Sequence, residues 1–566
     1  MFKMTTEVDP MLRFALACSS ALLLSACASV QGPDQTTPEG PAPIDTALLS
    51  EDIRVLSSDA FGGRGIATPN EQMTIDYVSR AWAAAGFEPG GVNGSWVQPV
   101  TLRRFNMTGA EASVSVGGRM IRLDQGEDIV MSTRLPSANG HVELSGLPLV
   151  FVGYGIDAPE RNWDDFDGVD VRGKIIVVLI NDADFEEPAL DTFNGRAMTY
   201  YGRWTYKYEE AARQGAAGVL IVHEDAPASY GWTTVRNSWT GPQFDIERDN
   251  PSDERTQLEA WISRDTAVEL FSQAGLDFEA LKAQARQRGF RAVEIPGATF
   301  DGSYELAADT IQTNNIVGRL PGTTHPDETV LYTAHWDHIG IGEPDAEGDR
   351  IFNGAVDNAS GVAGLIELAR LYGQTPRPER SVVLVGFTAE ESGLLGSEFY
   401  ASNPIYDPAT TVAGFNIDSM NVVGPTTNIS VTGSGYSTLE TNLARFALAQ
   451  GRTIEADGSP EAGYYFRSDH FPLARRGIPM LYADGGSILR DGGAVAMQAW
   501  SNDYRANRYH QANDEWSADW NLDGMAEDIL LLYRMGLDLA NSREWPSWNE
   551  GTEFRLTREQ TAARRH

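Results

Sequence analysis

The sequence predicts an α/β protein whose mixed, mostly parallel sheet is flanked by helices, with a β-rich domain inserted into that fold. Two observations favour this class. From about residue 310 to residue 540, continuous apolar runs of strand length alternate with amphipathic helical stretches. Between about residues 123 and 300, strand signals bounded by Gly, Pro and Asp prevail instead. Uninterrupted apolar strands indicate a sheet that helices cover on both faces.

In the first zone, residues 45–122, helical patterns cover 45–56 and 70–85, and Gly86 is placed to end the second helix. The middle zone, residues 123–300, begins with apolar strands and continues with a helix that ends near Gly215 before a buried strand. These segments are the strands 147–155 and 173–180 and the helix-to-strand stretch 207–222.

The third zone, residues 301–545, alternates strands with helices, and residues 546–566 follow it as a C-terminal tail. Its predicted strands are 328–334, 381–389, 411–417 and 478–483. Its predicted helices are 361–372, 394–401, 437–450 and 522–541.

Composition excludes several classes of protein. The 566 residues are 42% hydrophobic and 22% charged, which is typical of a globular chain rather than a disordered one. The net charge of −35 argues against binding to nucleic acid or to anionic lipid surfaces, since both require basic patches. The two cysteines, Cys18 and Cys27, both precede residue 30, so disulfides, thiolate ligands and a catalytic cysteine are not expected in the folded body.

Residues 1–27 predict a signal peptide, because Arg13 is followed by an apolar run too short to span a membrane. The run ends in LSAC, which resembles the lipobox of bacterial lipoproteins and would place a lipid anchor on Cys27; the alternative is a plain secretory signal with an incidental cysteine. Residues 28–44 read as a polar, proline-rich tether. We expect a location on the periplasmic side of the cell envelope, with Ala28 favouring the outer membrane, or else secretion.

Polar residues suited to metal binding follow the predicted strands of the third zone. In a parallel sheet, the carboxyl ends of the strands meet at one edge, where ligands gather. Each residue alone has a plainer explanation as a helix cap or a structural histidine, but buried like charges in one place require cations. Imidazole and carboxylate donors without sulfur suit Zn²⁺, with Mn²⁺ or Co²⁺ as substitutes. The residues are His335, Asp337, Asp357, Glu390, Glu391, Asp418 and His510.

The motifs AHWDHIG, NGAVDNASGVA, FTAEESGLLGS, NIDSM and YHQANDEW, in this order, resemble those of the M28 family of dinuclear zinc aminopeptidases. SSDAFGGRG and YFRSDHFPLARRGIPML are similar to that family as well. The middle zone resembles a protease-associated (PA) domain through LVFVGYGIDAPERNWDDFDGVDVRGKIIVVL and AARQGAAGVLIV. Such an inserted domain would shape access of the substrate and perform no chemistry.

The resemblance implies two Zn²⁺ ions held by five residues. Asp357 would bridge the ions, His335 and Asp418 would complete one site, and Glu391 and His510 would complete the other. Two divalent cations bring four positive charges, and the three carboxylates bring three negative ones. The remaining positive charge can be balanced by the hydroxide that attacks the substrate.

The resemblance also implies three residues for the reaction itself. Glu390 matches the general base that takes a proton from water and returns it to the leaving amine. Asp337 matches a carboxylate that orients His335. Tyr509 matches a tyrosine that stabilises the oxyanion in some members; alternatively, it is a ring packed beside a ligand.

The expected activity is therefore removal of N-terminal residues from peptides, with a peptide as the partner and the oligomeric state open. One alternative is a carboxypeptidase of the same family, which needs cations for a C-terminal carboxylate; Arg467, Arg505 and Arg508 are candidates. Others are glutaminyl cyclisation with one zinc and a non-catalytic PA-domain binding protein. Aromatic residues of the middle zone either line a substrate pocket or belong to the core; they are Trp204, Tyr206, Trp232 and Trp239.

Overall fold

The computed structural model describes residues 43–342, 344, 345 and 347–565. The signal peptide predicted for residues 1–27, its lipid attachment at Cys27 and nearly all of the tether at 28–44 lie outside the described residues. Within the described ranges, no helix combines the length and the apolar character that crossing a membrane requires.

Four parallel strands form the part of the sheet that carries the candidate site. β13 (His325–His335) lies between β16 (Arg380–Phe387) and β17 (Thr411–Asn416), and β20 (Met480–Gly485) pairs with β17. Every residue of β16 and β17 is buried. The predicted strands of the third zone are therefore confirmed, and so is the mixed, mostly parallel sheet.

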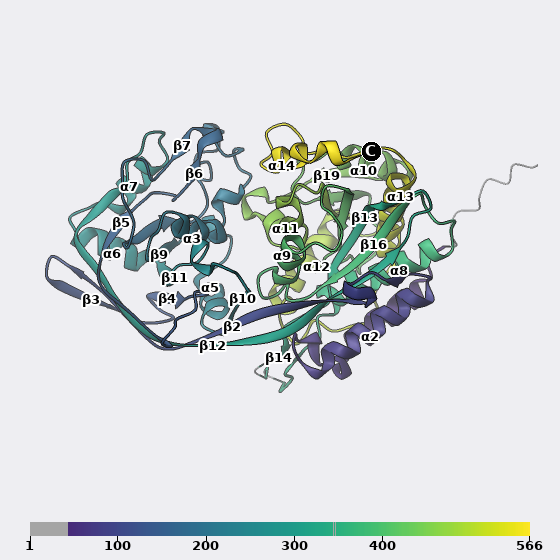
Figure 1. Cartoon of the computed structure of the whole chain (residues 1–566), viewed down its shortest axis with the longest axis horizontal. Coiled ribbons are helices and arrows are strands. Elements are labelled where there is room, and N and C mark those ends of the chain that lie inside the picture. Colours follow the sequence, from purple (N-terminus) through teal and green to yellow (C-terminus); the bar gives the residue numbers. More distant parts are fainter. Residues whose placement is uncertain (1–42, 343, 346, 566) are drawn as a thin grey trace, which may run out of the picture. The chain divides into compact units, whose positions relative to one another are not determined.

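Helices cover both faces of this part of the sheet. Val330 and Tyr332 of β13 belong to one core cluster, together with α1 (Thr46–Leu56), α2 (Pro69–Ala84), α8 (Gly361–Gly373) and α13 (Asp523–Asn541). Leu331, between them, points to the other face and packs with α9 (Leu395–Ser402) and α11 (His470–Arg475). Figure 1 shows α2 and α8 together beside β13 and β16. The fully apolar strands thus result from burial on both faces.

The helix ends follow local signals in the sequence. Asp45 caps α1 by accepting hydrogen bonds from the backbone N–H groups of Ala47 and Leu48. Gly86, just beyond α2, has a φ of 90°, which glycine adopts without strain. Both helices predicted in the first zone are confirmed to within a residue.

Two long strands that the sequence did not predict join the two halves of the sheet. β2 (Val97–Val116) and β12 (Val293–Leu320) pair antiparallel along most of their length, as Figure 1 shows. β12 also pairs with β16 on one side and with β5 (His141–Phe151) on the other. Because β12 crosses residue 300, the hydrogen-bonded sheet is continuous there. The division into zones at 45–122, 123–300 and 301–545 stays a prediction.

The middle zone has a parallel arrangement of its own. β5, β8 (Ile175–Leu179), β9 (Gly218–His223) and β11 (Leu258–Ser263) are parallel neighbours in that order. Its longer helices are α3 (Trp204–Arg213), α5 (Trp232–Trp239), α6 (Arg264–Gln273) and α7 (Phe278–Ala285). The predicted helix-to-strand stretch 207–222 corresponds to the end of α3 followed by β9.

The remaining elements are shorter or peripheral. The strands are β1 (Glu88–Pro89), β3 (Arg119–Leu123), β4 (Ile129–Ser132), β6 (Asp157–Ala158), β7 (Trp163–Asp164), β10 (Gln243–Ile246), β14 (Gly340–Ile341), β15 (Ile351–Phe352), β18 (Asn428–Val431) and β19 (Thr453–Ala456). The helices are α4 (Asp225–Ala228), α10 (Leu439–Ala449), α12 (Gly493–Asn507) and α14 (Arg555–Gln560).

Candidate metal and catalytic centre

The candidate site lies at the carboxyl ends of the parallel strands. His335 is the last residue of β13, Glu390 and Glu391 follow β16, and Asp418 follows β17. Asp357 lies in the turn immediately before α8. Because β13, β16 and β17 run parallel, residues far apart in the sequence meet at one edge of the sheet.

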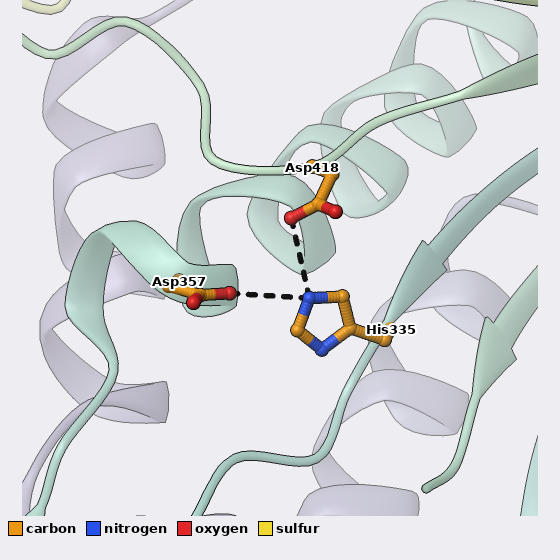
Figure 2. Close-up of side chains that lie close together, drawn as sticks. All are labelled: His335, Asp357 and Asp418. Carbon is orange, nitrogen blue, oxygen red and sulfur yellow. Dashed lines mark hydrogen bonds and ion pairs between the residues drawn. The ribbon is translucent and has the colours of Figure 1, made fainter. Parts of the chain in front are cut away.

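His335 faces two carboxylates with the same ring nitrogen. Its Nε2 atom lies 3.2 Å from Oδ1 of Asp357 and 3.2 Å from Oδ1 of Asp418. Figure 2 shows the imidazole pointing between the two acids, which come from different segments of the chain. All three residues are largely buried, so little solvent separates them.

His510 repeats this arrangement on the other side of Asp357. Its Nε2 atom lies 3.3 Å from Oδ2 of Asp357 and 3.1 Å from Oε2 of Glu391. Asp357 therefore turns one carboxylate oxygen towards each histidine. The five residues predicted as metal ligands form two adjoining donor sets that share this aspartate.

The site has an excess of negative charge. Burial favours the neutral imidazole, but the surrounding carboxylates outweigh burial and raise the pKa of His335 and of His510 well above the ordinary value. Burial raises the pKa of Glu391, but His510 and His338 outweigh it and lower that pKa to about 2. Such a field favours cations.

The donor set fits divalent metal ions. Asp357, Glu391 and Asp418 bring three negative charges, and the imidazoles of His335 and His510 bring nitrogen donors without any sulfur. Three of these groups, His335, Asp357 and Asp418, offer atoms that all lie within 4.8 Å of one another. Nitrogen and carboxylate donors converging in this way are the ligands that zinc takes in proteins.

Glu390 lies beside this cluster and is held through its backbone. Its N–H donates to Oδ1 of Asp337 at 3.1 Å, and its carboxylate lies within 4.8 Å of donor atoms of His335 and Glu391. Burial raises the pKa of Glu390 well above its ordinary value, with Glu391 and Asp418 adding to the rise and His335 opposing it. A carboxyl in this position can accept and release a proton beside the candidate metal ligands.

Asp337 contacts His335 mainly through its backbone. The Nδ1 atom of His335 lies 3.1 Å from the backbone oxygen of Asp337 and 3.9 Å from its carboxylate. Burial raises the pKa of the Asp337 carboxyl to about 8. Orientation of His335 by that carboxylate stays a prediction, because the nearer atom is the peptide oxygen.

Tyr509 is 46% exposed and stacks on His510, with ring centroids 3.9 Å apart and an interplanar angle of 28°. This contact fits the interpretation of Tyr509 as a ring packed beside a ligand. Its predicted contribution to oxyanion binding stays a prediction.

Asp514 supports the candidate bridging residue, a role that was not predicted from the sequence. Its carboxylate accepts hydrogen bonds from the backbone N–H groups of Val356 and Asp357, at 3.1 and 3.0 Å, and from the hydroxyl of Tyr504 at 3.1 Å. Asp514 is 1% exposed. The place of Asp514 in the YHQANDEW motif, four positions after His510, is the only sequence signal for this supporting role.

Arg64, from the SSDAFGGRG motif, fixes two loops of the site. It is fully buried, and its guanidinium donates to four backbone oxygens at 2.7–2.9 Å, those of Leu56, Trp336, Asn353 and Gly354. Trp336 follows His335 directly, and Gly354 lies just before the turn that contains Asp357. The motif therefore acts through positioning.

Two further side chains orient the carboxylates. Ser468 donates from Oγ to Oδ2 of Asp418 at 2.7 Å, which leaves Oδ1 towards His335. Nδ1 of His338 lies 2.5 Å from Oε1 of Glu391, whose other oxygen faces His510. His338 also forms a close donor set with Asp357 and Glu391.

Arg505 and Arg508, two of the arginines considered for binding a C-terminal carboxylate, are engaged near the end of α12. Arg505 donates to Asn502 at 3.1 Å, and Arg508 pairs with Asp503 at 2.9 Å. Arg467, the third of these arginines, lies in a different segment of the chain, directly before Ser468.

The aromatic residues considered for a substrate pocket pack into the middle zone. Trp204 and Trp239 form an edge-to-face pair at 5.0 Å, Trp232 donates to the backbone oxygen of Gly126, and Tyr206 is 4% exposed. The structure thus favours their interpretation as core residues.

Fold and site together define an α/β protein with a carboxylate-rich candidate metal centre at the carboxyl ends of its parallel strands. Residues 315–533 match the sequence model of peptidase family M28, so the chain carries a domain of that family. The matched range includes all five candidate ligands, as well as Glu390, Asp337 and Tyr509.

Individual proteins resemble the chain to different extents. A "Probable zinc metalloprotease" of Pyrenophora tritici-repentis is 34% identical over 119 residues, which are 21% of this chain and 27% of that protein. The "Probable lipoprotein aminopeptidase LpqL" of Mycobacterium tuberculosis is 22% identical over 461 residues, 79% of this chain and 73% of that protein. A solved aminopeptidase from Aneurinibacillus sp. strain AM-1 aligns with 88% of this chain and 95% of its own, with 19% identity and a TM-score of 0.48. The chain spans about a quarter of the length of the first curated relatives that it matches.

Proposed function

We propose that the protein is a zinc-dependent aminopeptidase that removes N-terminal residues from peptides. The observation that carries this proposal is Asp357, whose two carboxylate oxygens face His335 and His510 at 3.2 and 3.3 Å. The M28 domain and the extended similarity to a protein named as a lipoprotein aminopeptidase support it.

Two zinc ions would be held by the five candidate ligands. His335 and Asp418 would bind one ion, His510 and Glu391 the other, and Asp357 would bind both. The three carboxylates bring three negative charges against four positive ones, so the pair of ions compensates the buried acids. Mn²⁺ or Co²⁺ can take the same donors.

In the reaction, bound zinc ions would supply a more acidic water molecule and polarise the scissile carbonyl group. Glu390 would take the proton from the attacking water and pass it to the leaving amine. Its hydrogen bond to Asp337 fixes the backbone that presents this carboxylate. Tyr509 would donate to the oxyanion of the tetrahedral intermediate.

Glu390→Gln tests the proposal, because it removes the proton acceptor while leaving all five candidate ligands in place. We expect kcat to fall about 100- to 10,000-fold, the usual contribution of general acid–base catalysis. Zinc content should stay at two ions per chain. Glu398→Gln is a matched control, since Glu398 lies in α9 and pairs with Arg476 at 3.5 Å. Near wild-type turnover by the Glu390 variant would refute the assignment of the base.

Two related activities are separated by substrate choice. A carboxypeptidase would cleave N-acetylated peptides and reject C-amidated ones, whereas an aminopeptidase does the reverse. Glutaminyl cyclisation would need one zinc ion and an N-terminal glutamine. A non-catalytic binding protein would cleave no peptide, with or without added zinc.

The location and the role of the middle zone are also proposals. We propose that the signal at residues 1–27 leaves a lipid on Cys27, which holds the protein on the periplasmic side of the envelope. Cys27→Ser should then release the protein from membrane fractions. We propose that residues 123–300 form a PA-like domain that shapes substrate access. Contacts of this zone with residues 460–471, the segment that contains Ser468, support this. The backbone N–H of Met198 donates to the backbone oxygen of Pro460 at 3.0 Å, and the ring of Tyr200 packs on that of Phe471.

A further inference from the structure

Two arginines from distant parts of the sequence lie close enough for their charges to interact, and one of them adjoins a residue that contacts a candidate metal ligand. Arg203 immediately precedes α3 of the middle zone, and Arg467 immediately precedes Ser468. The guanidinium of Arg467 lies 5.0 Å from the ring centroid of Tyr464 and 5.7 Å from that of Tyr230. Burial, together with the nearby charge of Arg467, lowers the pKa of Arg203 to about 9.

Both arginines have buried N–H groups without an acceptor. Arg203 is only 7% exposed, and its Nε atom has no hydrogen-bond partner in the part of the chain that the structure describes. The same is true of Nε and Nη2 of Arg467. A buried donor that loses its water without gaining a partner is costly, and more so when it is charged.

Neighbouring arginines differ in this respect. Arg475 lies 3.7 Å from the carboxylate of Glu209, and Arg196 lies 2.8 Å from that of Glu461. No ion pair of Arg203 or Arg467 occurs among the described residues. Two cations are therefore brought together while the nearby acids pair with other arginines.

We infer that Arg203 and Arg467 form a subsite for a carboxylate of the peptide substrate. The planar fork of a guanidinium matches a carboxylate with two parallel hydrogen bonds, and a buried anion would satisfy the free donors of both residues. The carboxylate is either the C-terminus of a short peptide or an acidic side chain. This inference rests on the proposed peptidase function.

The position of Arg467 connects the subsite with the reaction. Ser468, the next residue, donates to Asp418, one of the five candidate ligands. Arg467 thus belongs to the chain segment that orients a candidate ligand. Arg467 as a whole residue is only partly buried.

The test compares peptides that differ only in charge. The first series consists of tri- and tetrapeptides that share the same N-terminal residue and have either a free or an amidated C-terminus. The second series consists of amidated peptides that have either Asp or Asn directly after that N-terminal residue. We expect wild-type kcat/KM to favour one carboxylate-bearing series by about tenfold or more, mainly through KM. Arg203→Met and Arg467→Met should abolish that preference, and Arg203→Lys should restore part of it.

Arg196→Met is the matched control, since Arg196 lies at the same contact between zones but pairs with Glu461 and is 65% exposed in its side chain. It should keep the wild-type preference. A preference for free C-termini supports a subsite that binds the C-terminal carboxylate of the peptide. A preference for Asp supports a subsite that binds an acidic side chain. Equal rates for charged and neutral peptides in the wild type, or a preference that survives in both methionine variants, overturn the inference.

The same assay separates this inference from the proposed function. Wild-type hydrolysis of aminoacyl p-nitroanilides, which carry no carboxylate, reports the peptidase alone. If these substrates and all free-amine peptides resist the zinc-loaded wild type, the proposed function fails and the subsite fails with it. If they are cleaved but carboxylates confer no preference, only the subsite fails.

Discussion

Asp514 offers a sharp test of how the candidate bridging aspartate is held. Its carboxylate accepts the N–H groups of Val356 and Asp357 at 3.1 and 3.0 Å, through different oxygens. Asp514→Asn replaces one oxygen by an NH₂ group, so one backbone donor then faces another donor. The substitution also removes a negative charge near the site.

The size of the effect follows from these contacts. A hydrogen bond to a charged group contributes about 1.5–3 kcal/mol, and an unsatisfied buried N–H costs about 1–3 kcal/mol. We therefore expect the free energy of unfolding of the metal-free protein to fall by about 2–4 kcal/mol. Displacement of Asp357 should weaken zinc binding about 10- to 100-fold, as is typical when a residue that supports a metal ligand is changed.

The assay is competition for zinc with a chelator of known affinity, combined with urea unfolding of the metal-free protein. Tyr504→Phe is the matched control, because it removes the hydroxyl that donates to Asp514 and leaves both backbone contacts intact. Its zinc affinity should change less than about threefold. Wild-type zinc affinity in Asp514→Asn would show that this residue does not position Asp357.

Three further predictions concern other parts of the chain. Arg64→Lys should lower the free energy of unfolding by about 3 kcal/mol or more, because lysine cannot donate to four backbone oxygens at once; urea unfolding measures this, and an unchanged midpoint would contradict it. Removal of zinc by a chelator should abolish peptide hydrolysis and lower Tm, and zinc added back should restore both, whereas persistent activity in the metal-free protein would contradict the proposal. Burial raises the pKa of Asp245, but nearby arginines outweigh burial and lower it to about 2, so its carboxylate should stabilise the fold fully above about pH 4 and lose that contribution as the pH falls towards 2. Asp245→Asn should therefore lose about 2 kcal/mol at neutral pH, and this difference should shrink below pH 4; a difference that is constant with pH would contradict the assignment. The arginines that lower the pKa of Asp245 are Arg255, Arg248 and Arg134.

The strands that sequence reasoning found are those buried on both faces. Every residue of β16 and β17 is buried, so both appear as continuous apolar runs. β2 and β12 were missed because exposed and buried positions mix along them, and β12 contains Pro296 and three glycines. Their pairing joins Val97 to Ile316, a separation that no local pattern signals.

The candidate ligands could be predicted because each lies in a recognisable motif at a strand end or in an adjoining loop. Their supporting contacts could not, because these depend on which atom reaches which neighbour. The nearest contact of Asp337 with His335 is through a backbone oxygen, and Asp514 acts on Asp357 through two N–H groups. Arg203 and Arg467 are 264 positions apart, and neither position alone indicates an unpaired cation.

In the proposed centre, one aspartate, Asp357, joins two metal sites. Anomalous diffraction at the zinc absorption edge, on crystals of the protein with zinc, can locate both ions. We predict two peaks, one beside His335 and Asp418 and one beside His510 and Glu391, each in contact with Asp357. A single peak, or two peaks of which one does not touch Asp357, would rule out a shared aspartate between two ions.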